Sequence, residues 1–220
     1  MTQLETELHF LKDEVKNMWS LVTSQLIKAS KALFAFDKDL AREVILKEKR
    51  VNGSELKIDR DCENILALYT PVAIDLRFVL AVLKINSNLE RIGDIAEGIA
   101  KYVLDASGPF SEEILKATQI VEMYQESLAM LEDTQVAFEN EDTVIARGVF
   151  KKDEFLDAIN ISANELIESY LDEYPKDLDH ALYILSIIRK LERVGDQSKN
   201  IAEEIIFYLE AKVLKHSNKA

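Results

Sequence analysis

The 220-residue chain contains one six-residue motif twice, and this duplication constrains its fold more than any other feature. Residues 89–94 read LERIGD and residues 191–196 read LERVGD, so five of six positions are identical at an offset of 102 residues. An Ile-Ala pair follows each copy at the same offset, at 99–100 and 201–202. Repetition in two similarly punctuated halves indicates two copies of one structural unit.

The punctuation predicts long helices. The chain has only 6 Gly and 3 Pro, and apolar residues in its first segment recur in steps of three and four, which is typical of one buried helix face. Thr70-Pro71 and Tyr174-Pro175 are expected to separate helices, and residues 105–109 form the clearest break. The expected helices span about 8–36, then from a turn around 37–39 to about 69, then 72–104, 111–138 and 141–170, with a sixth running to Leu214.

These elements predict an all-α fold. Two copies of a helix-helix-Pro-helix pattern correspond to two tandem three-helix bundles, six helices in all, related by the internal repeat. The break at 105–109 places the boundary so that the first repeat covers 1–107 and the second covers 108–220.

The net charge of the chain limits the classes of partner that it is expected to bind. A formal net charge of -13 disfavours binding to nucleic acid or to anionic lipid and favours cations or basic protein surfaces. A single cysteine, Cys62, indicates a reducing compartment. The first residues lack the pattern of a signal peptide, and no run reaches the ~20 apolar residues that span a bilayer. A cytoplasmic protein is expected.

Acidic side chains recur at helical spacing. Positions i, i+4, i+7 and i+11 share one face of a helix, and two expected helices carry oxygen-bearing side chains at that spacing, inside otherwise apolar sectors. The helices that contain the duplicated motif add further carboxylates on one face. The acids of these stripes are Glu48, Glu55, Asp59, Glu90, Asp94, Asp153, Asp157, Glu192 and Asp196.

Carboxylates inside an apolar sector need neutralisation, because a buried charge is costly unless it is protonated, paired or bound to a cation. Hard metal ions take oxygen ligands from adjacent helices of a bundle, so the stripes predict metal sites. The alternative is that the acids lie on a partly wet face or pair with Arg91, Arg193, Lys84 and Lys199. Gly93 and Gly195 predict close helix packing or room for a ligand.

At these residues the chain resembles the PhoU family of phosphate-specific transport accessory proteins. The two copies of the motif and the segment 71–79, PVAIDLRFV, carry the resemblance, which extends over nearly the whole chain. It implies two three-helix bundles with iron or zinc, as ions or multinuclear clusters. By position, one site would use Glu48, Glu55, Asp59, Glu90 and Asp94, and the other Asp153, Asp157, Glu192 and Asp196.

The resemblance also implies a function. Members of the family restrain phosphate uptake and phosphate-starvation signalling by contacting the ATPase of the phosphate ABC transporter and a sensor histidine kinase; a homodimer is also expected. This chain departs from the family at Asn52, Ile95 and Gln197, where Asp or His is frequent, and Asn160 and Asn164 weaken the second stripe. No motif nominates an enzyme. A metal-free helical interaction module and a carboxylate-bridged metalloenzyme are the alternatives.

Overall fold

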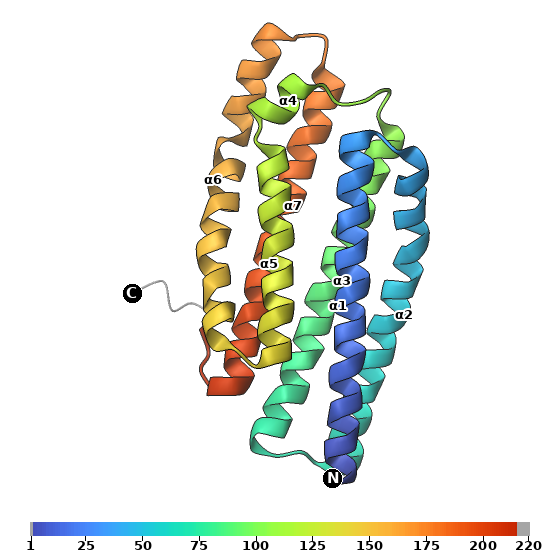
Figure 1. Ribbon diagram of the computed structural model, residues 1–220, viewed down its shortest axis with the longest axis vertical. Helices are drawn as coiled ribbons and strands as arrows, with labels where there is room; N and C mark the ends of the chain where they lie inside the picture. Colours follow the sequence, from blue (N-terminus) through green and yellow to red (C-terminus); the bar gives the residue numbers. More distant parts are fainter. Residues whose placement is uncertain (1, 215–220) are drawn as a thin grey trace.

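The computed structural model describes residues 2–214, and within that range the chain forms seven α-helices and no strand (Figure 1). The prediction of an all-helical fold is confirmed. The helices are α1 (Gln3–Ala35), α2 (Lys38–Tyr69), α3 (Ala73–Asp105), α4 (Glu112–Ala117), α5 (Ile120–Asn140), α6 (Thr143–Glu173) and α7 (Leu178–Glu210).

Local chemistry explains most of these limits. Thr2 begins α1 with a reciprocal capping box to Glu5, and Asp37 and Asp142 accept hydrogen bonds from the first backbone N–H groups of α2 and α6. Such side chains satisfy donors that a helix leaves unpaired. At Thr70 the backbone turns left-handed, so α2 ends just before Pro71 as predicted.

The prediction of six helices is wrong in the third quarter of the chain. The helix expected over 111–138 is divided into α4 and α5. Thr118 donates its hydroxyl hydrogen bond to Ile114 O at 2.7 Å, and Gln119 adopts a left-handed backbone with φ 52. A positive φ at a non-glycine residue interrupts the helical ladder, and this break has neither Gly nor Pro to announce it.

The final helix is also shorter than expected. It ends at Glu210, whereas the apolar pattern predicted Leu214. Ala211 has φ 57, and its N–H bonds to Phe207 O, which closes the last turn. The sequence pattern overestimates the length of α7 because Val213 and Leu214 continue the helical spacing of apolar residues beyond its end.

The helices pack as two groups. α1, α2 and α3 each contact the other two, and so do α5, α6 and α7, while α4 lies across one end of the second group. The groups meet where α3 contacts α7 and where α1 contacts α5. Figure 1 shows α3 and α7 running in opposite directions side by side. The duplicated motif therefore lies on the two helices that join the groups.

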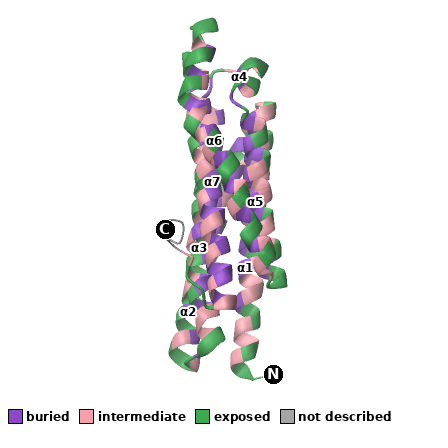
Figure 2. Ribbon diagram, turned by 90° about the vertical axis from the view of Figure 1, so that its left-hand side faces the viewer, coloured by how far each residue is buried: buried purple, intermediate pink, exposed green. Residues whose placement is uncertain are grey.

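The core is continuous across this junction (Figure 2). Trp19 of α1 is fully buried with its ring centroid 5.2 Å from that of Phe138 of α5. The hydroxyl of Tyr124, on α5, donates to Leu26 O of α1 at 2.9 Å. Shared aromatic packing and a buried cross-group hydrogen bond make the two groups one folded unit.

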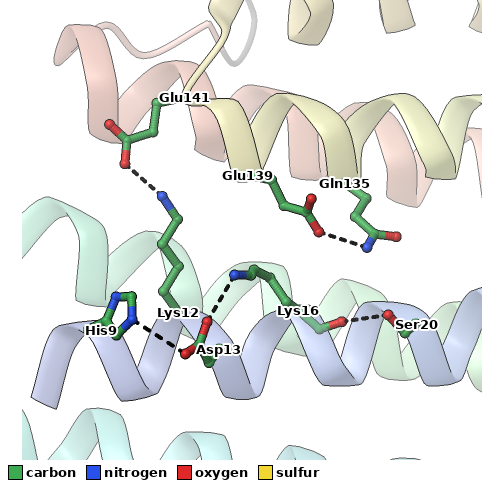
Figure 3. A network of polar contacts seen from close by, with 8 residues as sticks. All are labelled: His9, Lys12, Asp13, Lys16, Ser20, Gln135, Glu139 and Glu141. Carbon is green, nitrogen blue, oxygen red and sulfur yellow. Dashed lines mark hydrogen bonds and ion pairs between the residues drawn. The ribbon is translucent and has the colours of Figure 1, made fainter.

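Polar side chains lie at the surface of the same junction (Figure 3). Lys12 of α1 reaches Glu141, in the turn after α5, with Nζ–Oε1 at 2.7 Å, and lies 5.8 Å from the ring centroid of Phe138. Beside it, Asp13 accepts from Lys16 at 2.9 Å and faces His9 at 3.6 Å. Ion pairs at the protein surface such as these contribute little to the free energy of unfolding.

Candidate functional site

The first set of acids lies on α2 and α3, which pack against each other, and we call it cluster 1. Its most N-terminal member on α2, Glu48, is buried with 5% of its surface exposed. Three members are half-buried and Asp94 is exposed, so burial falls from one end of the cluster to the other. Cluster 1 consists of Glu48, Glu55, Asp59, Glu90 and Asp94.

The carboxylates of cluster 1 are close enough to change one another's pKa values. Burial raises the pKa of Glu48 to about 7, with repulsion from Asp94, Glu97 and Glu90 adding to it and a hydrogen bond from Gln25 opposing it. Burial and then neighbouring carboxylates likewise raise the pKa of Glu55 and of Glu90. Repulsion from neighbouring carboxylates thus disfavours the charged forms of Glu48, Glu55 and Glu90, and a cation beside them would relieve it.

Two buried amides from neighbouring helices position this cluster, and the sequence analysis missed both. Gln25 of α1 donates from Nε2 to Glu48 Oε2 at 3.2 Å. Asn86 of α3 donates to Asp59 Oδ1 at 2.9 Å and to Glu55 O at 3.0 Å. The only signal was a polar residue on an apolar helix face, as at Gln25, which lies between Val22 and Leu26 in the pattern of α1.

The second set of acids, cluster 2, lies between α6 and α7. Asp153 is buried at 4% exposure, and Lys199 of α7 donates a short hydrogen bond to its Oδ2. The same ammonium lies 3.6 Å from Asp196 Oδ1. Burial still raises the pKa of Asp153 although Lys199 opposes the shift. Cluster 2 consists of Asp153, Asp157, Glu192 and Asp196, of which the last three are half-buried.

The two clusters therefore differ in how they are neutralised. Lys199 minus the repeat offset of 102 gives position 97, which is a glutamate. Glu97 adds charge to cluster 1 and pairs with Lys101 at 2.5 Å. Of the pairing alternatives in the sequence, Lys199 binds cluster 2, whereas Lys84 binds Glu204. Cluster 2 contains its own cation, and cluster 1 contains a further acid in that place.

The duplicated glycines bring the helices close to these acids. A Cβ on Gly93 would lie 3.1 Å from Val51 Cγ1 and 3.3 Å from Glu48 Oε2. On Gly195, a Cβ would lie 2.7 Å from a Leu156 methyl and 3.1 Å from Asp153 Oδ1. Each glycine thus permits close packing beside the buried carboxylate of its cluster, as one of the two predictions for these residues stated.

The donor set of cluster 1 fits a hard, oxygen-loving cation. Glu48 Oε1 is buried and lacks a hydrogen-bond partner among residues 2–214, and so does Asp153 Oδ1 in cluster 2. An orphaned buried carboxylate oxygen is what an arriving ion would satisfy. In the conformation described for residues 2–214, no group of three or more His, Cys, Asp or Glu side chains is placed to hold an ion, so binding requires side-chain rotation.

The fold and its paired clusters define an all-helical protein with a duplicated acidic motif. The family model described as the PhoU domain matches residues 15–103 and 120–205, which contain both clusters. The chain belongs to the PhoU family. Among residues 2–214, no helix has the length and apolar content needed to cross a membrane.

Relatives match over almost the whole chain. The phosphate-specific transport system accessory protein PhoU of Edwardsiella tarda is 32% identical over 97% of this chain and 87% of its own length. The homologue of Aquifex aeolicus is 33% identical over 98% of this chain and 97% of its own length. These relatives are named as accessory proteins rather than enzymes.

Solved structures show the same fold. The crystal structure of the phosphate transport system regulatory protein PhoU from Streptococcus pneumoniae superposes with a TM-score of 0.86 at 32% identity, covering 96% of this chain and 99% of that one. PhoU from Pseudomonas aeruginosa gives 0.88 at 29% identity, covering 96% of this chain and 100% of that one.

Proposed function

We propose that this protein is a cytoplasmic regulatory adaptor that restrains phosphate uptake and phosphate-starvation signalling. The observation that carries the proposal is the match to proteins named as phosphate-specific transport accessory proteins over 97% of the chain. An adaptor acts by contact, and its partners in this proposal are the ATPase of the phosphate ABC transporter and a sensor histidine kinase. A homodimer presenting two such surfaces is part of the proposal.

The architecture supports two functional repeats. α1–α3 and α5–α7 form mutually contacting groups, and each contains one copy of the motif on its last helix. In this proposal residues 1–107 and 108–220 are two three-helix repeats, each with one acidic cluster. The protein has no catalytic role of its own; the clusters serve to bind cations.

Metal ions are the proposed occupants of the clusters. Cluster 1 would hold iron or zinc, singly or as a multinuclear centre, through Glu48, Glu55, Asp59, Glu90 and Asp94. A bound ion supplies positive charge that offsets the mutual repulsion of these acids. Cluster 2 would bind more weakly, because an ion must first displace Lys199 from Asp153.

A metal-free helical interaction module is the second candidate. It is favoured by Lys199, which already neutralises Asp153, and by the protonation of Glu48 that its raised pKa of about 7 allows. In that case both clusters are tolerated without an ion, and regulation depends on protein contacts alone.

The regulatory proposal is tested by deleting the gene in the organism that encodes the chain. We expect phosphate-starvation genes to be expressed in high phosphate, and their repression to return when the wild-type gene is supplied. Reporter expression in high phosphate is the measurement, with low phosphate as the control. Unchanged repression after deletion would contradict the adaptor function and leave the metal proposal to its own test.

A further inference from the structure

A hollow of about 490 Å³ lies between α3 and α7, on the seam between the two groups of helices. It adjoins cluster 1, because Asp94 belongs to both, but neither α2 nor α6 lines it; its acids are Asp94, Glu97 and Asp105. Its charged lining residues number four cations and three acids, a balance of 4 − 3 = +1, in a chain of net charge -13. The cations are Arg91, Lys101, Lys190 and Arg193.

Lys190 lines this hollow from α7. Its side chain crosses from α7 to α3 and lies over Gly98, where an added Cβ would be 2.5 Å from Nζ. The ammonium is 5.6 Å from the ring centroid of Tyr102. Because Gly98 has no side chain, the ammonium can lie against α3. The ring of Tyr102 adds a cation–π contact.

Three of the cations make no close ion pair with a carboxylate within residues 2–214. They are Arg91, Lys190 and Arg193, although the charges of Asp94 and Glu97 act on Lys190 from a greater distance. Of the acids that line the hollow, Glu97 is already bound by Lys101 at 2.5 Å. The two guanidinium groups and one half-buried ammonium thus keep their donors available.

The repeat does not explain this set of cations. Arg91 and Arg193 are equivalent, since 193 − 102 = 91, and the duplication supplies both. Lys190 corresponds to Asn88, however, and Gly98 corresponds to Asn200. The repeat-equivalent positions therefore contain neither the lysine nor the glycine that accommodates it, and this pair is not a product of the duplication.

We infer that this hollow binds a phosphoryl oxyanion, either inorganic phosphate or the terminal phosphate of a nucleotide, through Lys190, Arg193 and Arg91. Guanidinium groups present paired N–H donors that match phosphate oxygens, and an ammonium adds a compact charge. The anion would bridge helices from the two groups of the bundle, so its binding would strengthen their junction. The inference depends only on contacts of α3 and α7 and stands whether or not the proposed function holds.

Calorimetric titration of the full chain at low ionic strength with inorganic phosphate, and separately with ATP, tests this inference. Lys190→Gln and Arg193→Gln are each expected to weaken binding about tenfold or more, because a hydrogen bond between charged groups is lost. Lys31→Gln, which removes an exposed lysine of α1 outside the hollow, is expected to bind like the wild type.

The two ligands distinguish the source of the phosphoryl group. Binding of phosphate alone identifies the free anion, and binding of ATP without phosphate identifies a nucleotide. Thermal unfolding of each variant confirms that it is folded before titration. The inference is overturned if neither ligand binds at millimolar concentration, or if both hollow variants bind as tightly as Lys31→Gln.

Discussion

Replacing Lys199 by glutamate is expected to lower the free energy of unfolding of the metal-free protein by about 2–4 kcal/mol. Loss of one partner from a buried ion pair typically costs ~3–5 kcal/mol, and Lys199, with its side chain 32% exposed, falls toward the lower end. The new carboxylate also repels Asp153 and Asp196, which the ammonium now holds. Equilibrium denaturation at pH 7.5 measures the change.

The same substitution gives cluster 2 a glutamate at the position where cluster 1 has Glu97. A divalent cation should therefore recover part of the lost stability in Lys199→Glu and add less to cluster 2 of the wild type. Lys151→Glu makes the same charge change at an exposed position on α6 and should cost no more than ~0.5 kcal/mol. Equal destabilisation by the two variants would show that Lys199 has no special role.

Glu48→Gln is expected to stabilise the metal-free protein by about 1–2 kcal/mol at pH 8. Burial raises the pKa of Glu48 from 4.5 to about 7, so the folded state disfavours its charged form by up to ~3 kcal/mol, and solvent at the groove reduces that figure. Glutamine keeps the shape and the acceptor for Gln25 without the charge. For a chain of this length, the midpoint of thermal unfolding should rise by about 2–8 °C.

The pH dependence of stability provides a sharper form of this prediction. Because the folded pKa of Glu48 lies above the unfolded value, the folded state binds more protons between pH 4.5 and about 7. The contribution of Glu48 to stability is therefore present below pH 4.5 and falls as the pH rises through 7. Glu48→Gln should lose this part of the slope, whereas Glu63→Gln, an exposed change on the same helix, should keep it. If the free energy of unfolding depends on pH identically in the two variants, the raised pKa of Glu48 is contradicted.

The sequence predicted the long helices well, since apolar spacing and the breaks at Pro71 and Pro175 are local signals. It failed between α4 and α5, because neither Gly nor Pro marks the left-handed backbone at Gln119. It failed again at Ala211, where an apolar continuation concealed the end of α7.

The spacing of the acids along each helix was predictable from the sequence, but their electrostatics were not. Helical spacing brought the acids of each stripe to one face, and the structure places these stripes on two pairs of contacting helices, α2 with α3 and α6 with α7. Spacing within a helix could not reveal which cation lies opposite, so the sequence left Lys199 as one pairing alternative of four. It marked Gln25 only as a polar residue on an apolar helix face and did not show that its side chain, from a third helix, donates to Glu48.

The exposure of Asp94 shows a further limit of sequence patterns. The motif places it on the same face as Glu90, yet it lies at the open side of the groove while Glu48 lies at the buried end. Depth within a groove depends on how far the neighbouring helices diverge, and a single-helix pattern holds no such information.

The most direct test of a cation at cluster 1 is metal content. The chain is purified without chelators, analysed for bound elements, then stripped and titrated with iron(II) and zinc(II). We expect at least one ion per chain, with Asp94→Ala removing most of the binding and Asp196→Ala removing less, because Lys199 already serves cluster 2. A chain that carries no metal and takes up neither ion after stripping would contradict the account.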